Sequence, residues 1–246
     1  MLTLLHQGVP GDAPRLEVLL VLFPGFNTLD MNGPFDVLSK SGTSTSFNIQ
    51  VASESTDRCG ITRSTEGVKV QHDFQLDDVL IASLHRYDVL VVPGGSVDAV
   101  SKQASQRDSA FMRLIAAFSQ LPQRPTKRPR VLLSICTGGL FLGSLGIFGG
   151  KFCTTHWAAY DDLKERVKSA ALVSGGQPGR VIKARFVDSG LNDSNIRVIS
   201  AGGISCGIDA SLYLVKLLIG EEEAISTAEI LDYAYRQTDG VVIDDD

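Results

Sequence analysis

The sequence predicts an α/β protein with a doubly wound, mostly parallel sheet and helices on both faces. Two observations support this class. Short runs of apolar and β-branched residues, typical of strands buried on both faces, alternate along the chain with longer segments of helical spacing. Several of these runs stop at turn-forming pairs such as Pro24-Gly25 and Pro93-Gly94. Because alternating strands and helices are joined by crossover connections, the strands are expected to pair in parallel.

In the first half of the chain, a strand is followed by a helix and then by further strands. Residues 16–23 form a continuous apolar run, which predicts the first strand. A helix is expected over residues 28–40, with Pro34 at the first position of a helix, where a missing N–H costs no hydrogen bond. Further strands are expected at residues 47–52, 68–70 and 87–92, and a helix at 109–121.

The second half of the chain continues this alternation and ends in two helices. Strands are expected at residues 131–135, 152–155 and 196–200, the last preceded by a lengthened hairpin at 191–195. Helices are expected from the end of the 131–135 strand to about residue 145, and at 158–167, 208–219 and 221–235. The last helix opens with three glutamates, which the positive end of a helix dipole favours.

Composition indicates a single globular domain. With 43% hydrophobic and 21% charged residues among 246, the chain can bury a full core. One domain over residues 1–246 is expected, with its core at about residues 16–235 and flexible termini at 1–14 and 237–246. No apolar run reaches the length of a membrane span, and the N-terminus lacks a secretory pattern. We therefore expect a cytoplasmic protein without membrane association.

Charge and cysteine usage exclude several other classes of protein. The net charge of −5 gives no electrostatic footprint for nucleic acid, and the basic segment 124–130 is interpreted as a solvated loop. Four cysteines without a CxxC pair argue against a disulfide framework and against a zinc site. The histidines also lack the spacing of metal ligands, so no metal is expected.

The most informative motif is a cysteine at the end of a buried strand. The run from Val131 to Ile135 leads directly into Cys136-Thr137-Gly138, a pattern typical of a nucleophile elbow. A thiol at this corner lies beside the N–H groups of the next helix, which favour thiolate over thiol. Most free cysteines are small buried hydrophobes, but such a role would not require this turn. Cys136 is therefore the candidate chemical centre.

Two other strand ends carry polar groups. The first strand is followed by Asp30, and a middle strand ends at Gly94-Gly95. In an open parallel sheet, ligands bind beyond the carboxyl ends of the strands. A carboxylate, free glycine N–H groups and the thiol of Cys136 could thus meet in one crevice, although an Asp before a helix is usually a cap and a Pro-Gly-Gly usually a turn.

These motifs resemble those of the DJ-1/PfpI superfamily, also called ThiJ/PfpI, in the expected order from about residue 16 to residue 219. They also resemble its isocyanide hydratase-like branch. The motifs are Leu29-Asp30-Met31-Asn32-Gly33-Pro34-Phe35, Val91-Val92-Pro93-Gly94-Gly95, Ser134-Ile135-Cys136-Thr137-Gly138, Thr154-Thr155-His156-Trp157 and Ser200-Ala201-Gly202-Gly203-Ile204-Ser205-Cys206-Gly207-Ile208-Asp209.

The resemblance implies a flavodoxin-like, class I glutamine amidotransferase-like fold and a homodimer that uses no cofactor. It implies a hydro-lyase that hydrates a small-molecule isocyanide to an N-substituted formamide through a thioimidate at Cys136. Asp30 would be the acid/base carboxylate, with Thr137 as a second polar group at the elbow. The oxyanion or substrate-binding residues would be Gly94, Gly95, Gly138 and His156.

The pairing of Asp30 with Cys136 has an electrostatic consequence. Two ionised groups a few Å apart in a partly dry crevice disfavour each other's charge, so the pair is expected to share protons and to titrate as a unit. We expect a thiolate at Cys136 that accepts a hydrogen bond from a protonated Asp30. His156 could also pair with Cys136, but packing against the site wall is favoured. Cys153, where relatives carry another residue, could bring a second thiol near the elbow.

Other functions stay open. A glyoxalase-like enzyme would convert an α-oxoaldehyde to a hydroxy acid, although relatives of that kind mostly pair the cysteine with Glu. A non-enzymatic redox or stress sensor would need only an oxidisable cysteine beside a carboxylic acid. A transcription regulator would need a further DNA-binding segment after the last helix, and an amidotransferase would need a His-x-Glu, which the chain lacks after its last strand.

Overall fold

An eight-stranded sheet forms the centre of the protein. The computed structural model describes residues 15–42, 46–54, 59–124 and 128–243. The strand order is β12-β10-β11-β7-β6-β1-β2-β5. Among the described residues, β10 and β11 are the one antiparallel pair in this sheet, and every other neighbouring pair is parallel. The predicted α/β class with a mostly parallel sheet is confirmed.

The sheet strands are β1 (Arg15–Leu22), β2 (Ser46–Ser53), β5 (Phe74–Gln75), β6 (Val89–Val92), β7 (Arg130–Ser134), β10 (Phe186–Leu191), β11 (Ile196–Ala201) and β12 (Gly240–Val242). Two small sheets lie apart from it. The first is an antiparallel hairpin of β3 (Ile61–Arg63) and β4 (Lys69–Gln71). The second is a parallel pair of β8 (Phe152–Cys153) and β9 (Arg180–Val181).

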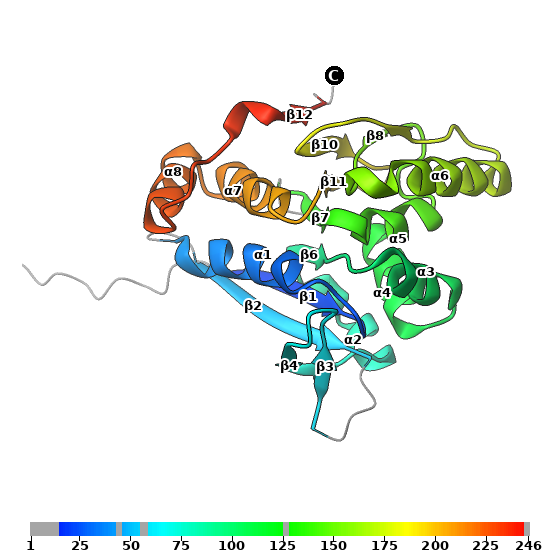
Figure 1. The fold of residues 1–246 in the computed structure, drawn as a ribbon, viewed down its shortest axis with the longest axis horizontal. Coiled ribbons are helices and arrows are strands. Elements are labelled where there is room, and N and C mark those ends of the chain that lie inside the picture. The colour runs from blue at the N-terminus through cyan, green and yellow to red at the C-terminus, as the bar shows by residue number, and fades with distance from the viewer. Residues whose placement is uncertain (1–14, 43–45, 55–58, 125–127, 244–246) are drawn as a thin grey trace, which may run out of the picture.

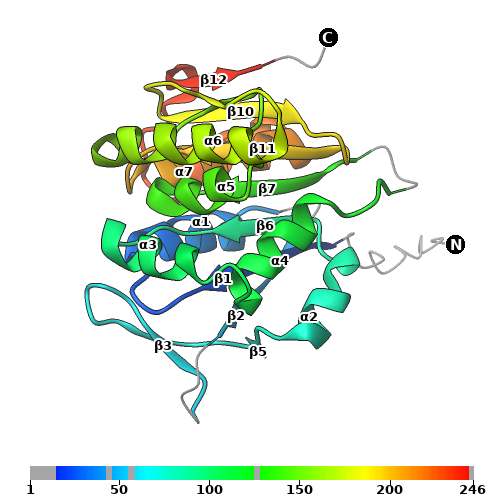
Figure 2. The same ribbon diagram turned by 90° about the vertical axis from the view of Figure 1, so that its right-hand side faces the viewer.

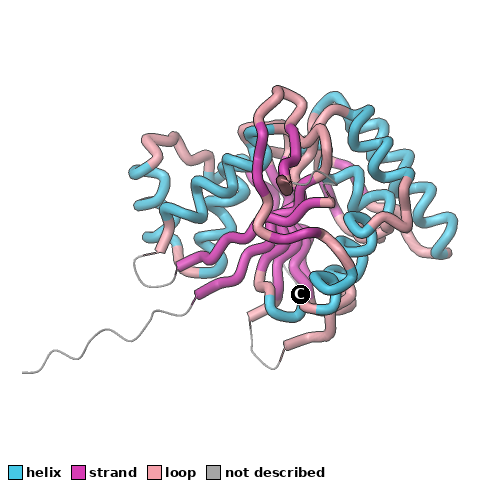
Figure 3. Tube along the Cα trace, turned by 90° about the horizontal axis from the view of Figure 1, so that it is seen from below, coloured by secondary structure: helices cyan, strands magenta, loops and turns pink. Residues whose placement is uncertain are grey.

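Helices cover both faces of the sheet, as Figures 1 and 2 show. One layer contains α1 (Thr28–Lys40), α7 (Cys206–Leu218) and α8 (Glu221–Ile230), which pack on one another. The other contains α2 (Asp78–Ala82), α3 (Val97–Ser105), α4 (Ala110–Ser119), α5 (Gly139–Ser144) and α6 (Tyr160–Ser174). Seen from below, the strands fan out between the two layers with the usual twist (Figure 3).

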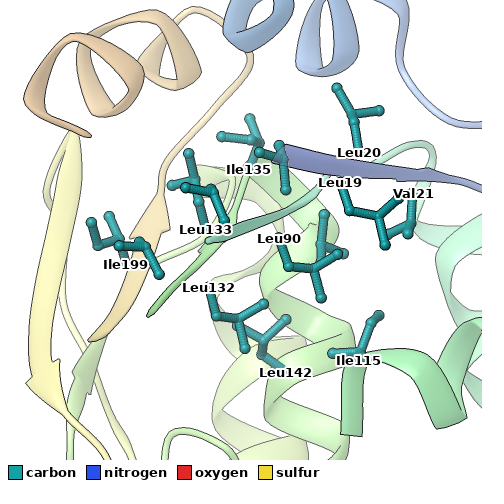
Figure 4. Close-up of a cluster of buried hydrophobic side chains, with 14 of the residues drawn as sticks. Leu19, Leu20, Val21, Leu90, Ile115, Leu132, Leu133, Ile135, Leu142 and Ile199 are labelled. Atoms are coloured by element: carbon teal, nitrogen blue, oxygen red, sulfur yellow. The ribbon is translucent and has the colours of Figure 1, made fainter. Parts of the chain in front are cut away.

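The core lies on both faces of the central strands, because these strands are apolar at successive positions. Leu19, Leu90 and Leu132 are buried on adjacent strands and point toward one helical layer (Figure 4). Leu20 points toward the opposite layer, as the alternation of side chains along a strand requires. The packed core therefore fixes the positions of the strand ends that the candidate site residues follow.

Helix α1 differs from the prediction at Pro34. The helix begins at Thr28 and continues without interruption to Lys40, so Pro34 lies in its interior rather than at a first position. A proline there cannot donate to the carbonyl oxygen of Asp30, which costs helix stability. Packing offsets this cost, because Gly33 approaches α7 so closely that a Cβ would lie 3.3 Å from Ile208 Cγ1.

The C-terminal region also departs from the prediction. Helix α8 ends at Ile230 rather than near 235, because Asp232 adopts a left-handed backbone with φ of 47°. Of the expected flexible end at residues 237–246, the described part up to 243 contains a short 3-10 turn and strand β12, which pairs with β10, and residues 244–246 lie outside the described residues. A Cβ at Gly240 would lie 2.1 Å from Phe186 Cζ, so this pairing needs glycine. The other expected flexible end, residues 1–14, lies outside the described residues.

Most predicted elements form close to their expected bounds, but several short ones were missed: α2, α3, β3, β5, β9, β10 and β12. Helix α6 extends to Ser174, seven residues beyond the predicted end at 167, and stops at Gly175 with φ of 71°. In the basic segment, Arg124 pairs with Asp88, while residues 125–127 lie outside the described part. No helix in the described ranges combines the length and apolar character needed to cross a bilayer.

Candidate active site

Three neighbouring strands bring the candidate residues together. Strands β7, β6 and β1 are adjacent and parallel, so their carboxyl ends lie at one edge of the sheet. Cys136 follows β7, Gly94 and Gly95 follow β6, and Asp30 lies in the first turn of α1, which follows β1. The convergence expected from the sequence is present.

Cys136 occupies a strained elbow between β7 and α5. Its φ is 56°, a left-handed value that costs a residue with a Cβ about 1–2 kcal/mol. Thr155 Oγ1 donates to the Cys136 carbonyl oxygen at 2.7 Å, which helps to hold the turn. Gly138 follows because a Cβ there would lie 2.4 Å from the Val92 carbonyl oxygen. The elbow thus presents the thiol at the sheet edge, with Cys136 4% exposed.

Asp30 is fully buried behind the thiol. Its Oδ2 accepts a hydrogen bond from the Gly94 N–H at 3.1 Å, while Oδ1 has no hydrogen-bond partner in the described part of the chain. Burial raises the pKa of Asp30 to about 7, against the lowering effect of hydrogen bonds from Gly94 and Cys136, and the charge of Glu66 adds a smaller increase. A carboxyl group that titrates near neutral pH is suited to moving protons.

Burial of Cys136 acts against the thiolate that the sequence predicts. Burial raises its pKa to about 12, and the charge of Asp30 adds to this shift. The N–H groups of Thr137 and Ile204 act in the opposite direction but are weaker than burial. Helix α5 has only six residues, so its dipole is small. Burial thus raises the pKa of both members of the pair, and the raised pKa of Asp30 is the lower of the two.

The N–H groups of Gly94, Gly95 and Gly138 already donate hydrogen bonds within the protein. The Gly94 N–H donates to Asp30, and the Gly95 N–H donates to Thr137 Oγ1 at 2.9 Å. Thr137 Oγ1 in turn donates to the Gly95 carbonyl oxygen at 2.7 Å, and the Gly138 N–H donates to the Ile135 carbonyl oxygen at 2.8 Å. The predicted oxyanion donors Gly94, Gly95 and Gly138 therefore position the site instead of presenting free N–H groups.

The donors that face the sulfur are the N–H groups of Thr137 and Ile204. Sequence reasoning missed Ile204, because it contributes a backbone group and its side chain carries no chemistry. The turn that contains it, Gly202 to Cys206, was visible as a glycine-rich segment after β11. Its closeness to Cys136 follows from the pairing of β11 with β7.

His156 lies at the wall of the site. Its Nδ1 accepts a hydrogen bond from the Ala158 N–H at 3.2 Å, and burial lowers the pKa of the ring, so the neutral form carries its proton on Nε2. The ring packs on Gly203, where a Cβ would lie 2.8 Å from Cδ2. Among the described residues, the groups that shift the pKa of Cys136 do not include His156. This arrangement agrees with a wall position rather than a Cys–His pair.

Cys153 does not approach the elbow. It is buried in β8, where its thiol donates to the Arg180 carbonyl oxygen at 3.8 Å, and burial raises its pKa to about 12. The described residues that line the cavity at Cys136 do not include it. The second thiol expected near the site is thus directed elsewhere. Among the described residues, no cluster of three or more His, Cys, Asp or Glu side chains could hold a metal ion.

A cavity of about 270 Å³ opens over Cys136. Thr137, His156 and Ile204 form part of its lining, together with Thr65 and Glu66 from the turn between β3 and β4. This turn reaches the site from a separate small sheet, and no local pattern in the sequence predicts its position there. The cavity is large enough for a small organic substrate next to the sulfur.

The model of the DJ-1/PfpI family matches residues 16–187. The chain belongs to the DJ-1/PfpI family. Isonitrile hydratase from Pseudomonas putida is 31% identical over 220 residues, which cover 89% of this chain and 79% of that protein. The family expected from the motifs is confirmed.

Solved structures agree on the fold of this DJ-1/PfpI protein. A THiJ/PfpI family protein from Pseudomonas syringae has a TM-score of 0.65 at 21% identity, over 94% of this chain and 84% of that one. DJ-1 from Schizosaccharomyces pombe has a TM-score of 0.65 at 14% identity, over 89% of this chain and 100% of that one. At such identities the likeness concerns the fold alone.

Proposed function

We propose that this DJ-1/PfpI protein is a cofactor-free hydro-lyase that converts an isocyanide to an N-substituted formamide at Cys136. The observation that carries the proposal is the pair of a strained elbow thiol and a buried carboxyl group, Asp30, whose pKa is raised to about 7. Isonitrile hydratase is 31% identical over 89% of the chain, which supports the same chemistry. Isonitrile hydration is the activity named for that relative, and we extend it to this chain as a proposal.

The first half of the reaction uses Asp30 as a base. As the Cys136 sulfur attacks the terminal carbon of the isocyanide, the thiol proton passes to the Asp30 carboxylate. The protonated Asp30 then delivers this proton to the same carbon. One S–C bond and one C–H bond form, which gives a thioimidate, and Asp30 returns to the carboxylate.

The second half consumes one water molecule. Asp30 takes a proton from the water as the water oxygen adds to the thioimidate carbon, and Asp30 then passes this proton to the nitrogen. The S–C bond then breaks as the carbonyl forms, and the second proton of the water returns to the sulfur through Asp30. The N–H groups of Thr137 and Ile204 stabilise the sulfur as it leaves with negative charge. The products are the formamide and the original thiol.

The redox-sensor alternative is less well supported by the same geometry. Sensing cysteines react as thiolates at accessible positions. Cys136 is 4% exposed, and burial and Asp30 raise its pKa. A buried thiol with a base beside it is better suited to a reaction in which the proton leaves as the sulfur attacks.

A homodimer is part of the proposal. Leu29 and Phe35 on α1 are 41% and 37% exposed, and Ile204 is 37% exposed. A groove of about 360 Å³ lies between α1, the start of α7 and the segment after α8. A second copy that covers these side chains would also shield the entrance beside Ile204. Sedimentation of the purified chain at micromolar concentration measures its mass in solution, and we expect the mass of two chains.

The function is tested by incubation of the protein with an aryl isocyanide and with methylglyoxal. Formamide production that disappears in Cys136→Ser supports the proposal. Lactate production that disappears in the same variant would assign a glyoxalase-like reaction instead. If neither product forms above the rate of Cys136→Ser, the proposal is wrong.

A further inference from the structure

The turn between β3 and β4 is bound to the start of α1. Thr65 donates from its N–H to the Phe26 carbonyl oxygen at 2.8 Å and from Oγ1 to the Gly25 carbonyl oxygen at 2.6 Å. The next residue, Glu66, continues the contact with its carboxylate. Oε1 accepts from Asn27 Nδ2 at 2.8 Å, and Oε2 accepts from Thr28 N and Oγ1 at 2.9 and 2.6 Å. These bonds hold an exposed carboxylate in one place.

Glu66 is ionised at neutral pH. Burial alone would raise its pKa, but the hydrogen bonds from Thr28 outweigh burial and hold the pKa below its usual range. Its charge reaches the centre of the site, because it contributes to the raised pKa of Asp30. Glu66 also lines the cavity over Cys136. The cavity therefore has a fixed negative charge in its wall.

Nothing among the described lining residues offsets this charge. They include no Lys or Arg, and His156, the lining group that could become cationic, has a pKa lowered by burial. Behind the cavity, Asp30 adds a second carboxylate as it ionises. A reactant that enters this space meets negative potential and no cation to pair with an anionic group.

We propose that Glu66 is a specificity-determining residue that makes the Cys136 cavity exclude anionic reactants and accept uncharged or cationic ones. This inference rests on the proposed function for the reaction class, and it names the substrate class as isocyanides without a carboxylate, sulfonate or phosphate group. The selection by charge is a property of the cavity, so it can be measured without turnover.

The test compares two alkylating reagents of similar size, uncharged iodoacetamide and anionic iodoacetate, with modification at Cys136 followed by site-resolved mass spectrometry. Each rate is divided by the rate of a small free thiol, which removes the intrinsic difference between the reagents. We expect iodoacetate to be disfavoured about tenfold in the wild-type protein at low ionic strength. Glu66→Gln is expected to reduce this preference about threefold or more, and added salt is expected to do the same in the wild type.

The matched control is Glu222→Gln, which removes another exposed carboxylate, from the first turn of α8 and away from the cavity lining. It should keep the wild-type ratio. An unchanged ratio in Glu66→Gln would overturn the inference. If that variant does not fold, the salt dependence in the wild type decides: a reagent ratio that does not change with ionic strength overturns it.

A second measurement separates this inference from the proposed function. Hydration of an uncharged alkyl isocyanide is compared with hydration of a carboxylate-bearing isocyanide of the same length. Faster turnover of the uncharged compound, with the difference reduced in Glu66→Gln, supports both. If neither compound is hydrated, the proposed function fails while the alkylation ratio still decides the inference. Equal turnover of both compounds by the wild type would overturn the charge selection alone.

Discussion

The carboxyl group of Asp30 raises the pKa of the Cys136 thiol, while the thiol stabilises the Asp30 carboxylate. The Asp30 carboxyl group is completely buried. Its pKa is the lower of the two, so it is the first member of the pair to lose a proton as the pH rises. In the proposed reaction, Asp30 acts as a base beside the thiol, and loss of the thiol proton is coupled to attack by the sulfur. This differs from cysteine enzymes in which a neighbouring cation keeps the sulfur ionised.

The first prediction concerns Asp30 as the proton carrier. Asp30→Asn is expected to lower kcat for isocyanide hydration by about 100- to 10,000-fold, because an amide cannot accept the thiol proton. Steady-state formamide production measures this. Asp36→Asn, which changes an exposed carboxylate on the same helix, should leave kcat near the wild-type value. Normal turnover by Asp30→Asn would contradict the assignment.

The second prediction is the pH dependence of the reaction. Because the base form of Asp30 is required and its pKa is raised to about 7, kcat/KM should rise with pH up to about 7 and then level off. Initial rates between pH 5 and 9 at low substrate concentration test this. A profile that is flat over this range, or that has its midpoint near 4, would show that Asp30 is not the group that limits the rate.

The third prediction links the same carboxyl group to stability. The pKa of Asp30 is raised in the folded state, so its contribution is most favourable below its unfolded pKa and is lost as the pH rises through about 7. Asp30→Asn should therefore stabilise the protein at pH 8 relative to wild type, by on the order of 3 kcal/mol, and much less at pH 4. Urea denaturation at the two pH values measures the difference. An equal effect at both would disprove this linkage.

The fourth prediction concerns the effect of Glu66 on Asp30. Removal of the Glu66 charge eliminates one contribution that raises the pKa of Asp30. Glu66→Gln should therefore shift the acid limb of the kcat/KM profile to lower pH. Glu222→Gln serves again as the control, with an unshifted limb expected. A shift to higher pH in Glu66→Gln would have the wrong sign for a loss of negative charge.

The fifth prediction concerns the close approach of two strand ends. A Cβ at Gly94 would lie 2.4 Å from Thr137 Oγ1 and 2.7 Å from the Gly138 nitrogen. Gly94→Ala is expected to destabilise the fold by about 2–3 kcal/mol and to displace the N–H that holds Asp30. Gly176→Ala, at an exposed position with one 3.3 Å contact to Ser174 Oγ, should change little by comparison. Thermal and urea unfolding measure both variants.

Several parts of the site were predictable because their signals are local. A buried strand followed by a cysteine and two glycines predicts an elbow at Cys136, and the turn after the first strand predicts Asp30 near the sheet edge. The effect of burial on the Cys136 thiol was not predictable in this way. A helix N-terminus is visible in the sequence, whereas the burial that outweighs it depends on atoms contributed by distant segments.

The residues that were missed act over long sequence separations. Glu66 accepts a hydrogen bond from Thr28 across 38 positions, and Ile204 contributes its backbone N–H to the surroundings of the Cys136 sulfur. Pro34 is a second case in which contacts between distant segments override a local preference. Local preference places a proline at the start of a helix, but close packing of α1 on α7 keeps it in the interior.

The sequence by itself determined the parallel α/β class, the family and the candidate nucleophile, because periodicity and turn chemistry are properties of neighbouring residues. The tertiary structure decided which N–H groups are free, how strongly burial raises the pKa of Asp30 and of Cys136, and that Glu66 lines the cavity. Those properties depend on desolvation and on contacts between segments that only folding brings together.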